Sequence, residues 1–403
     1  MLGTDIAAVF SAGRGRWSGS DDRSGRRVTP SDRMTPSGPA VPAVLLITPH
    51  IEPPVVELEK LLANGRSVAV HCTNPVVVQA DRRALLDRLR YYWIDPVMAM
   101  IRLAPTLRRY ELVISYYHRN GYWLGLLRRL LGSGRAARWV WIGFAPNPRR
   151  RGLAGWIKEA LTDRALLGHD LVVCNALPVM EMIRSRYPRI AGRLAYVRWG
   201  GWGEGADDGK TSADAMDGGY VFCGGRTNRD FDTVLTAVAR LGCPTVIVAG
   251  NDVQFSANVP GHVSVHRDIS YEHFERLVKE SQIVVVSLKR PDVSSGQVDL
   301  GRAMRFGKPL VVTATAGLDD YVTDGKDAVL VAPGDAEDLG AKLASLLEDT
   351  ERRKELGQAA RLTYERSFNS RVFAHELFEV VTARSSRTHT STSTAHQGEE
   401  RGC

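Results

Sequence analysis

The sequence lacks the features that mark disulfide-rich, zinc-dependent and membrane-spanning proteins. Its five cysteines are odd in number and widely spread, and they include no CxxC pair, so the pattern predicts neither a disulfide framework nor a zinc site. No run approaches the roughly 20 consecutive apolar residues that a transmembrane helix needs. Residues 1–40 also lack the apolar segment of a secretory signal. We therefore expect reduced cysteines, a disordered leader over residues 1–40 and a cytoplasmic protein.

Several common catalytic signatures are missing as well. The sequence contains no HExxH, no GxSxG and no Walker-A lysine loop, which argues against zinc proteases, serine hydrolases and P-loop nucleotide hydrolases. It contains no recognised nucleic-acid-binding module, so binding to nucleic acid would rest on basic charge alone. We therefore predict no metal site and no nucleic-acid partner.

What the sequence does contain is an uneven distribution of charge over a chain long enough for two domains. At 403 residues, the chain exceeds what one hydrophobic core usually organises. Residues 41–200 carry 24 Lys and Arg against 11 Asp and Glu, a net of +13, whereas residues 201–403 carry 23 against 30, a net of −7. A basic domain attracts anionic lipid headgroups, phosphorylated acceptors or nucleic acid. A set of solvated, Arg-rich helices is the alternative explanation.

Two series of short β-branched runs alternate with amphipathic stretches, which is the pattern of parallel strands joined by helices. The first series predicts strands over residues 44–48, 67–72, 112–117, 138–144 and 170–175, and the second over 220–225, 244–250, 262–266, 283–288, 309–314 and 328–332. This alternation predicts an α/β protein with two Rossmann-like, doubly wound domains that face each other across a cleft.

Composition sets the expected domain boundaries. Residues 41–199 form the first predicted domain and residues 220–365 the second. The Gly- and Asp-rich segment 200–219 has no periodicity and is interpreted as a linker. The segment 366–383 is expected to form a helix that packs back on the first domain. Residues 384–403 are rich in Ser and Thr and are expected to be a disordered tail.

A glycine loop after the first strand of the second domain is a candidate phosphate site. The strand is followed by Gly224, Gly225 and Arg226, with Arg229 shortly after and a predicted helix beyond it. Paired glycines let the backbone approach a ligand closely, and two guanidinium groups suit a diphosphate. We therefore predict that these four residues bind the phosphates of a donor.

A second loop lies between a predicted strand and a predicted helix of the same domain. It reads Ser294, Ser295, Gly296 and Gln297, and backbone N–H groups at the start of the helix would suit phosphate oxygens. The alternative is that one of the serines simply caps the helix. Two such loops at strand ends of one domain favour a ligand site.

The C-terminal half resembles the donor-binding half of retaining GT-B glycosyltransferases of glycosyltransferase family 4. The resemblance covers residues 220–370, is much weaker over 41–200, and rests on the glycine loop and on the motifs Ala303-Met304, Gly307-Lys308-Pro309, Gly317, Asp320-Tyr321, Asp324-Gly325 and Val331 to Asp335. It implies a GT-B fold and transfer of a sugar, as in hexosyltransferases, from a nucleoside-diphosphate sugar co-substrate. It also implies a retaining reaction without an obligatory metal or other cofactor.

The sequence departs from this family at two positions. Where the family usually carries two glutamates separated by seven residues, this chain has Ser294 and Arg302. The ribose contacts must therefore differ, and Arg302 is a candidate for a phosphate or partner contact. A catalytically silent, glycosyltransferase-like partner or activator protein is the alternative function. The missing carboxylates argue against an epimerase, and no lysine setting suggests the pyridoxal phosphate of a phosphorylase.

The first domain contributes the predicted acceptor side. His118 and His50 follow predicted strands and are candidate catalytic residues, with a structural histidine at a strand end as the alternative for each. The run Arg149, Arg150 and Arg151 is the candidate guide for an anionic or lipid-linked acceptor, although a small-molecule acceptor stays open. Its aromatic neighbours are Trp139, Trp141, Phe144 and Trp156. These residues favour peripheral contact with the inner face of a membrane, and a solvated loop is the alternative.

Overall fold

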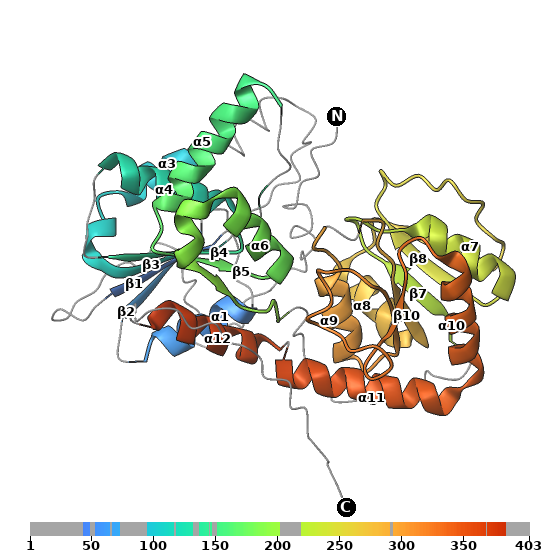
Figure 1. Cartoon of the computed structure of the whole chain (residues 1–403). Helices are drawn as coiled ribbons and strands as arrows, with labels where there is room; N and C mark the ends of the chain where they lie inside the picture. The colour runs from blue at the N-terminus through green and yellow to red at the C-terminus, as the bar shows by residue number, and fades with distance from the viewer. Residues whose placement is uncertain are drawn as a thin grey trace, which may run out of the picture.

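The chain forms two separate six-stranded sheets, each with helices on both faces (Figure 1). The structure, a computed structural model, describes residues 43–48, 53–64, 67–72, 95–116, 118–131, 137–144, 146, 151–201, 219–290, 293–367 and 369–383. The two sheets confirm the predicted pair of doubly wound α/β domains. The expected leader, most of the linker and the expected tail lie outside the described residues.

The N-terminal sheet is entirely parallel and has the strand order β2-β1-β3-β4-β5-β6. Its strands are β1 (Ala43–Thr48), β2 (Ser67–Cys72), β3 (Tyr110–Tyr116), β4 (Arg138–Ile142), β5 (Leu171–Cys174) and β6 (Leu194–Tyr196). Strands β3 to β5 read as nearly continuous apolar runs because helices bury both faces of a parallel sheet. Strand β6 was not predicted, because an apolar run of only three residues is too short to mark a strand.

Helices cover this sheet in two layers. They are α1 (Pro53–Leu62), α3 (Asp95–Leu103), α4 (His118–Leu131), α5 (Leu153–Leu167) and α6 (Leu177–Arg186). Helices α3 to α6 pack on one face through two apolar clusters, whereas α1 packs on the other face. Helix α5 extends beyond the sheet and forms the top of the domain in Figure 1.

The C-terminal sheet is also entirely parallel, in the order β12-β11-β10-β7-β8-β9. Its strands are β7 (Val221–Gly224), β8 (Thr245–Ala249), β9 (Val263–Arg267), β10 (Ile283–Val286), β11 (Leu310–Thr313) and β12 (Val329–Val331). Its helices are α7 (Phe231–Leu241), α8 (Tyr271–Glu280), α9 (Gln297–Arg305), α10 (Ala336–Glu348) and α11 (Thr350–Ser367). Each strand lies within a few residues of its predicted position.

Helix α7 shows how local sequence sets the start of an element beside the glycine loop. Asp230 caps the helix by accepting a hydrogen bond from the backbone N–H of Thr233, and Gly242 ends it with a left-handed φ of 64°. An acidic N-cap and a glycine just past the last turn are the usual signals for helix ends. The loop over residues 225–229 is therefore held between the end of β7 and a well-defined helix start.

The last helix, α12 (Ser370–Thr382), crosses from the C-terminal domain and packs against α1. Its Phe373 ring lies 5.3 Å from the Trp199 ring, centroid to centroid, and its Val381 carbonyl accepts a hydrogen bond from Arg138 of β4 at 2.9 Å. Figure 1 shows α11 running under the second domain and α12 continuing under the first. The two domains are thus joined by the C-terminal helix as well as by the segment after Trp199.

Candidate functional site

The carboxyl ends of strands from both sheets meet at the domain boundary. Tyr196, at the end of β6, donates a hydrogen bond to Asp320 at 3.1 Å. The Tyr321 hydroxyl accepts from the backbone N–H of Trp199 at 2.9 Å and donates to the Asn175 carbonyl at 3.2 Å. Ligands of open α/β sheets bind at such strand ends, so this boundary is where the candidate site is expected.

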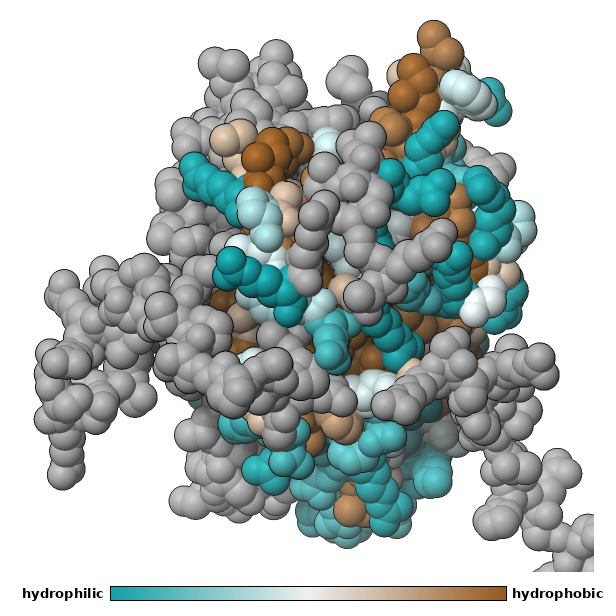
Figure 2. Space-filling model, turned by 90° about the vertical axis from the view of Figure 1, so that its left-hand side faces the viewer, coloured by the Kyte–Doolittle hydropathy of each residue, from teal (hydrophilic) through white to brown (hydrophobic). Residues whose placement is uncertain are grey.

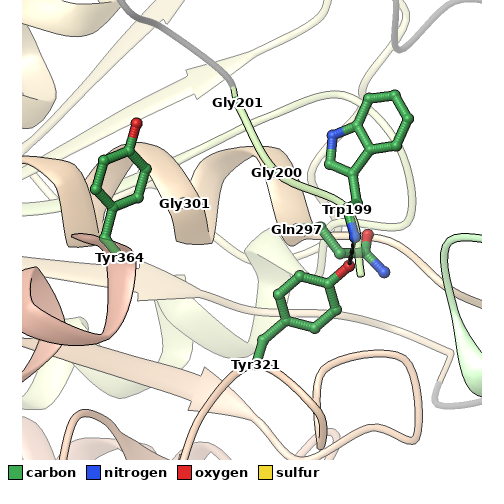
Figure 3. A pocket seen from close by; sticks show the side chains of 7 residues that line it. All are labelled: Trp199, Gly200, Gly201, Gln297, Gly301, Tyr321 and Tyr364. Atoms are coloured by element: carbon green, nitrogen blue, oxygen red, sulfur yellow. Dashed lines mark hydrogen bonds between the residues drawn. The ribbon is translucent and has the colours of Figure 1, made fainter. Parts of the chain in front are cut away.

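A small pocket lies at this boundary. Figure 3 shows that the segment after Trp199, the start of α9 and the rings of Tyr321 and Tyr364 surround it. Gln297, a predicted donor residue, lines its rim. The pocket therefore connects the loop before α9 with the junction of the two domains.

The loop after β7 has the backbone conformation that its glycines predict. Gly225 has a φ of +128°, and a Cβ at this position would lie 2.3 Å from Nε of Arg229, so only glycine fits here. Arg226 projects from the same loop, is half exposed, and lies 3.3 Å from Asp268, which is equally exposed. An exposed ion pair of this kind is weak, so the Arg226 guanidinium is available to an anion.

Arg229 points the other way, into the protein. Its side chain is only 5% exposed, and its guanidinium pairs with Asp299 and donates hydrogen bonds to the carbonyl oxygens of Gly224, at 2.9 Å, and Thr227, at 2.8 Å. These contacts hold the glycine loop in shape from beneath. Arg229 stays a predicted phosphate ligand, but in this structure its charge is already matched by a carboxylate.

Asn228 joins the two predicted phosphate loops, a role that the sequence did not indicate. It has a left-handed φ of 59°, a conformation that asparagine adopts more readily than most residues. Its side-chain amide donates to Ser295 Oγ at 3.1 Å and to the Arg290 carbonyl at 2.9 Å, and its side-chain oxygen accepts from the Arg290 N–H at 3.0 Å. The spacing between the loops is thus fixed by one side chain.

The start of α9 is not capped by a serine. The N-cap residue is Gly296, with a φ of 95° and no side-chain hydrogen bond, whereas Ser295 accepts from Asn228 and donates to the Val293 carbonyl. Ser294 accepts from Gln297 Nε2 at 2.6 Å. The alternative of simple serine capping is therefore wrong. No N-cap side chain binds the N–H groups in the first turn of α9, so the positive end of the helix dipole faces the loop.

Arg302 lies at the position where the family usually has a glutamate, and it faces helix α8. Its guanidinium pairs with Asp299 at 2.9 Å and Glu275 at 3.6 Å, and it stacks over Phe274 at 4.7 Å. Burial opposes the charge, but Asp299, Tyr271 and Glu275 together raise the pKa of Arg302 above its usual value. With only 7% of its side chain exposed, Arg302 supports the loop from behind, and a direct donor contact stays a prediction.

The predicted acceptor-side residues are described only in part. His118 is the first residue of α4, directly beyond the end of β3, and its side chain is not described. His50, Arg149 and Arg150 lie outside the described residues. Arg151 is exposed. Of the aromatic neighbours expected beside the arginine run, only Trp156 is exposed. Trp139, Trp141 and Phe144 lie in the core, because they face helices α4 to α6 across β4, and this part of the interpretation was wrong.

Within the described part of the chain, no group of three His, Cys, Asp or Glu side chains is placed to hold a metal ion. In the same part, no helix is long and apolar enough to span a bilayer. The exposed charged side chains described at the candidate donor site include Arg226, with Asp268 beside it, and Lys289 and Arg290 after β10.

Solved structures share this two-domain arrangement. Sucrose-phosphate synthase from Thermosynechococcus elongatus is similar with a TM-score of 0.60 at 18% identity, over 84% of this chain and 98% of that one. Anabaena Alr3699/HepE in complex with UDP is similar with a TM-score of 0.55 at 13% identity, over 84% of this chain and 99% of that one. At these identities the likeness shows the fold, and it confirms the predicted GT-B architecture.

The sequence comparisons each match only part of the chain. A stretch of 62 residues is 42% identical to the sulfoquinovosyl transferase SQD2 of Arabidopsis thaliana, and it spans 15% of this chain and only 12% of that protein. Residues 232–363 match the family model described as Glycosyl transferases group 1. The loop before α9, which the sequence predicts to bind the donor, lies within this match.

Proposed function

We propose that the protein is a glycosyltransferase that moves a sugar from a nucleoside-diphosphate sugar to an acceptor. The observation that carries this proposal is the match of residues 232–363 to the group 1 glycosyl transferases, on a chain with the GT-B fold. It is supported by the Anabaena protein of the same fold, which binds UDP, and by the name of the sulfoquinovosyl transferase. As the family 4 resemblance implies, we further propose a hexosyl transfer with retention and without a metal.

The donor diphosphate would lie between the two loops that Asn228 joins. Arg226 offers a guanidinium on one side, and the uncapped N–H groups of α9 offer a positive helix end on the other. Gly225 and Gly296 let the backbone approach the phosphates without a side chain between them. Two sources of positive character, one from each loop, suit a diphosphate better than a single phosphate.

The acceptor would approach from the N-terminal domain. His118 begins α4 at a strand end of that domain, where a neutral imidazole could hold an acceptor or sugar hydroxyl. The net of +13 over residues 41–200 favours an acceptor that is anionic or lipid-linked. The donor and acceptor halves of the reaction are thus assigned to different domains.

A silent, glycosyltransferase-like partner protein is the second candidate, and a specific observation favours it. The two family carboxylates are replaced by Ser294, which bonds to Gln297, and by the buried Arg302. Neither side chain is a carboxylate that could contact a transferred sugar. The second candidate predicts nucleotide binding without release of nucleoside diphosphate from the donor.

Nucleotide affinity of matched arginine variants tests the donor site. UDP, GDP and dTDP are titrated by calorimetry into the wild type, Arg226→Ala and the control Arg240→Ala, whose exposed side chain lies at the other end of α7. Loss of charge-assisted hydrogen bonds is expected to weaken binding by Arg226→Ala roughly ten-fold, with the control unchanged. Equal affinity in all three proteins would refute the assignment of Arg226.

Turnover of UDP-, GDP- and dTDP-sugars then separates the two candidate functions. An active enzyme releases nucleoside diphosphate, and NMR of the product shows whether the anomeric configuration is retained. Binding with no release, with or without added acceptors, would leave the silent partner protein as the function.

A further inference from the structure

The exposed apolar side chains of this protein are concentrated on one layer of the N-terminal domain. Among the described residues, six of the eight large hydrophobic side chains with high exposure lie on helices α3, α5 and α6: Met98, Ile101, Leu153, Trp156, Ile157 and Met182. The other two, Val259 and Leu362, lie apart in the C-terminal domain. Apolar groups of this size scattered singly need no explanation, but a grouping on one layer does.

The start of α5 shows the feature most clearly. Leu153, Trp156 and Ile157 have the spacing of one helix face, and Leu153 and Trp156 are 74% and 69% exposed. Figure 2 shows hydrophobic side chains projecting at the top of the molecule, where Figure 1 places α5. Because these side chains project from the molecule (Figure 2), the face suits insertion into a bilayer interface better than binding of a peptide.

The same layer is basic. Arg102, Arg129, Arg164 and Arg184 on α3 to α6 and Arg151 just before α5 are exposed, whereas Glu181 is the one exposed carboxylate among the described side chains of these helices. The α5 carboxylates Glu159 and Asp163 are less exposed, and they pair with Arg186 and Arg189 of the following segment. Arg184 pairs with Glu181, but among the described side chains of these helices exposed positive charge still outnumbers exposed negative charge.

We propose that the α3–α6 layer docks on an anionic lipid bilayer, with Leu153, Trp156 and Ile157 inserted among the headgroups and the surrounding arginines facing anionic lipid. Apolar side chains on a basic helix layer are the combination that binds bilayer interfaces. A symmetric dimer through this layer would bring the same positive charges together and is therefore disfavoured. The docking depends on the proposed function in one respect only, which is that the bilayer would supply a lipid-linked acceptor.

Vesicle flotation of the full chain tests the docking without any sugar nucleotide. The vesicles are of phosphatidylcholine alone or contain about one third phosphatidylglycerol, whose charge attracts arginine. The wild type is compared with Leu153→Ser/Trp156→Ser and with the matched control Val259→Ser/Leu362→Ser. We expect the wild type to bind the anionic vesicles and not the vesicles of phosphatidylcholine alone. Leu153→Ser/Trp156→Ser is expected to bind at least about ten-fold more weakly, because buried apolar area contributes much of interfacial binding. The control variant should bind like the wild type.

A charge variant and a fluorescence measurement sharpen the test. Arg151→Gln is expected to weaken binding about five-fold at low salt and much less near 1 M salt, where the screening length is about 3 Å. Tryptophan emission is expected to shift to the blue on vesicle addition in the wild type and not in Trp156→Phe. UDP affinity of the α5 variant should equal that of the wild type, so a failure of docking stays distinct from a failure of the proposed activity.

Three outcomes would overturn the proposal. One is equal flotation of the wild type and the α5 variant, and another is α5-dependent binding to RNA in place of vesicles. The third is a wild-type oligomer in gel filtration that Leu153→Ser/Trp156→Ser converts to a monomer, which would make a second copy of the chain the occupant of this face.

Discussion

The two domains share one architecture but use arginine in opposite ways. On the α3–α6 layer of the N-terminal domain, Arg102, Arg129 and Arg164 are exposed. Beneath the loops of the C-terminal domain, Arg229, Arg302 and Arg305 are at most 7% exposed and pair with Asp299 or Glu275. The first arrangement presents charge to a partner outside the protein, whereas the second uses charge to hold loop shape.

The domains also bury titratable groups differently. His169 of the N-terminal domain is fully buried beside Trp141, and burial lowers its pKa to about 4, so the imidazole is neutral inside the fold. The C-terminal network instead buries charges, with each one paired. At these two sites, stability is therefore expected to depend on ion pairing under the C-terminal loops and on pH at His169.

The largest expected effect comes from breaking the buried network. Arg302→Ala leaves Asp299 and Glu275 with less compensating charge in a buried setting, and the loss of one partner from a buried ion pair costs about 3 to 5 kcal/mol. The matched control is Arg226→Ala, which removes an exposed ion pair and should change stability by no more than about 0.5 kcal/mol. Urea unfolding measures both, and similar values for the two variants would remove the distinction between buried and exposed arginines.

The second effect is acid destabilisation through His169. The pKa of His169 is about 4 in the folded protein, whereas an unperturbed histidine has a pKa of 6.5, so the unfolded chain binds the proton more readily. This contribution to stability is fully present above pH 6.5 and is lost as the pH falls toward 4, by about 3 kcal/mol. Unfolding measured between these pH values checks the slope.

The control for the pH experiment is His375→Gln, because His375 is exposed on α12. This variant should keep the pH profile of the wild type. NMR titration of the His169 ring should show no protonation down to about pH 5. A His169 midpoint near 6.5 would contradict the neutral burial of this side chain.

The smallest effect concerns Asn228. Asn228→Ala removes three side-chain hydrogen bonds to Arg290 and Ser295. It also leaves alanine, which tolerates a left-handed backbone less well than asparagine, at a φ of 59°. Together these changes are expected to lower the free energy of unfolding by about 2 kcal/mol. Asn228→Gly removes the same bonds without backbone strain and should cost about 1 kcal/mol.

If Asn228 sets the spacing of the phosphate loops, both variants should weaken UDP binding to a similar extent despite their different stabilities. Wild-type UDP affinity in Asn228→Gly would show that the loops keep their spacing without this side chain. Calorimetry with UDP, alongside thermal unfolding of each variant, provides the comparison.

Much of the fold was predictable, because parallel strands buried on both faces leave continuous β-branched runs in the sequence. The positions of the Gly225 and Gly296 loops followed from those strands. The direction of Arg229 did not, since its partner Asp299 lies 70 residues away along the chain. The link from Asn228 to Ser295 likewise depends on two loops meeting in space.

Residue type alone also misled at β4. Trp139 and Trp141 stand close to the arginine run in sequence, yet β4 is a central strand and both rings are buried. Exposure along this segment is decided by where the strand ends and α5 begins. Only beyond that point do Leu153 and Trp156 reach the surface.

The Tyr321 hydroxyl limits how the two domains can separate. It holds the Trp199 N–H and the Asn175 carbonyl at once, while Phe373 of the crossing helix lies against the Trp199 ring. A translation of the C-terminal sheet away from the N-terminal domain would break both Tyr321 hydrogen bonds together. A rotation about an axis through these hydrogen bonds keeps them and separates the strand ends that lie farther from the axis. Substrate entry and product release are therefore expected to proceed by rotation about Trp199.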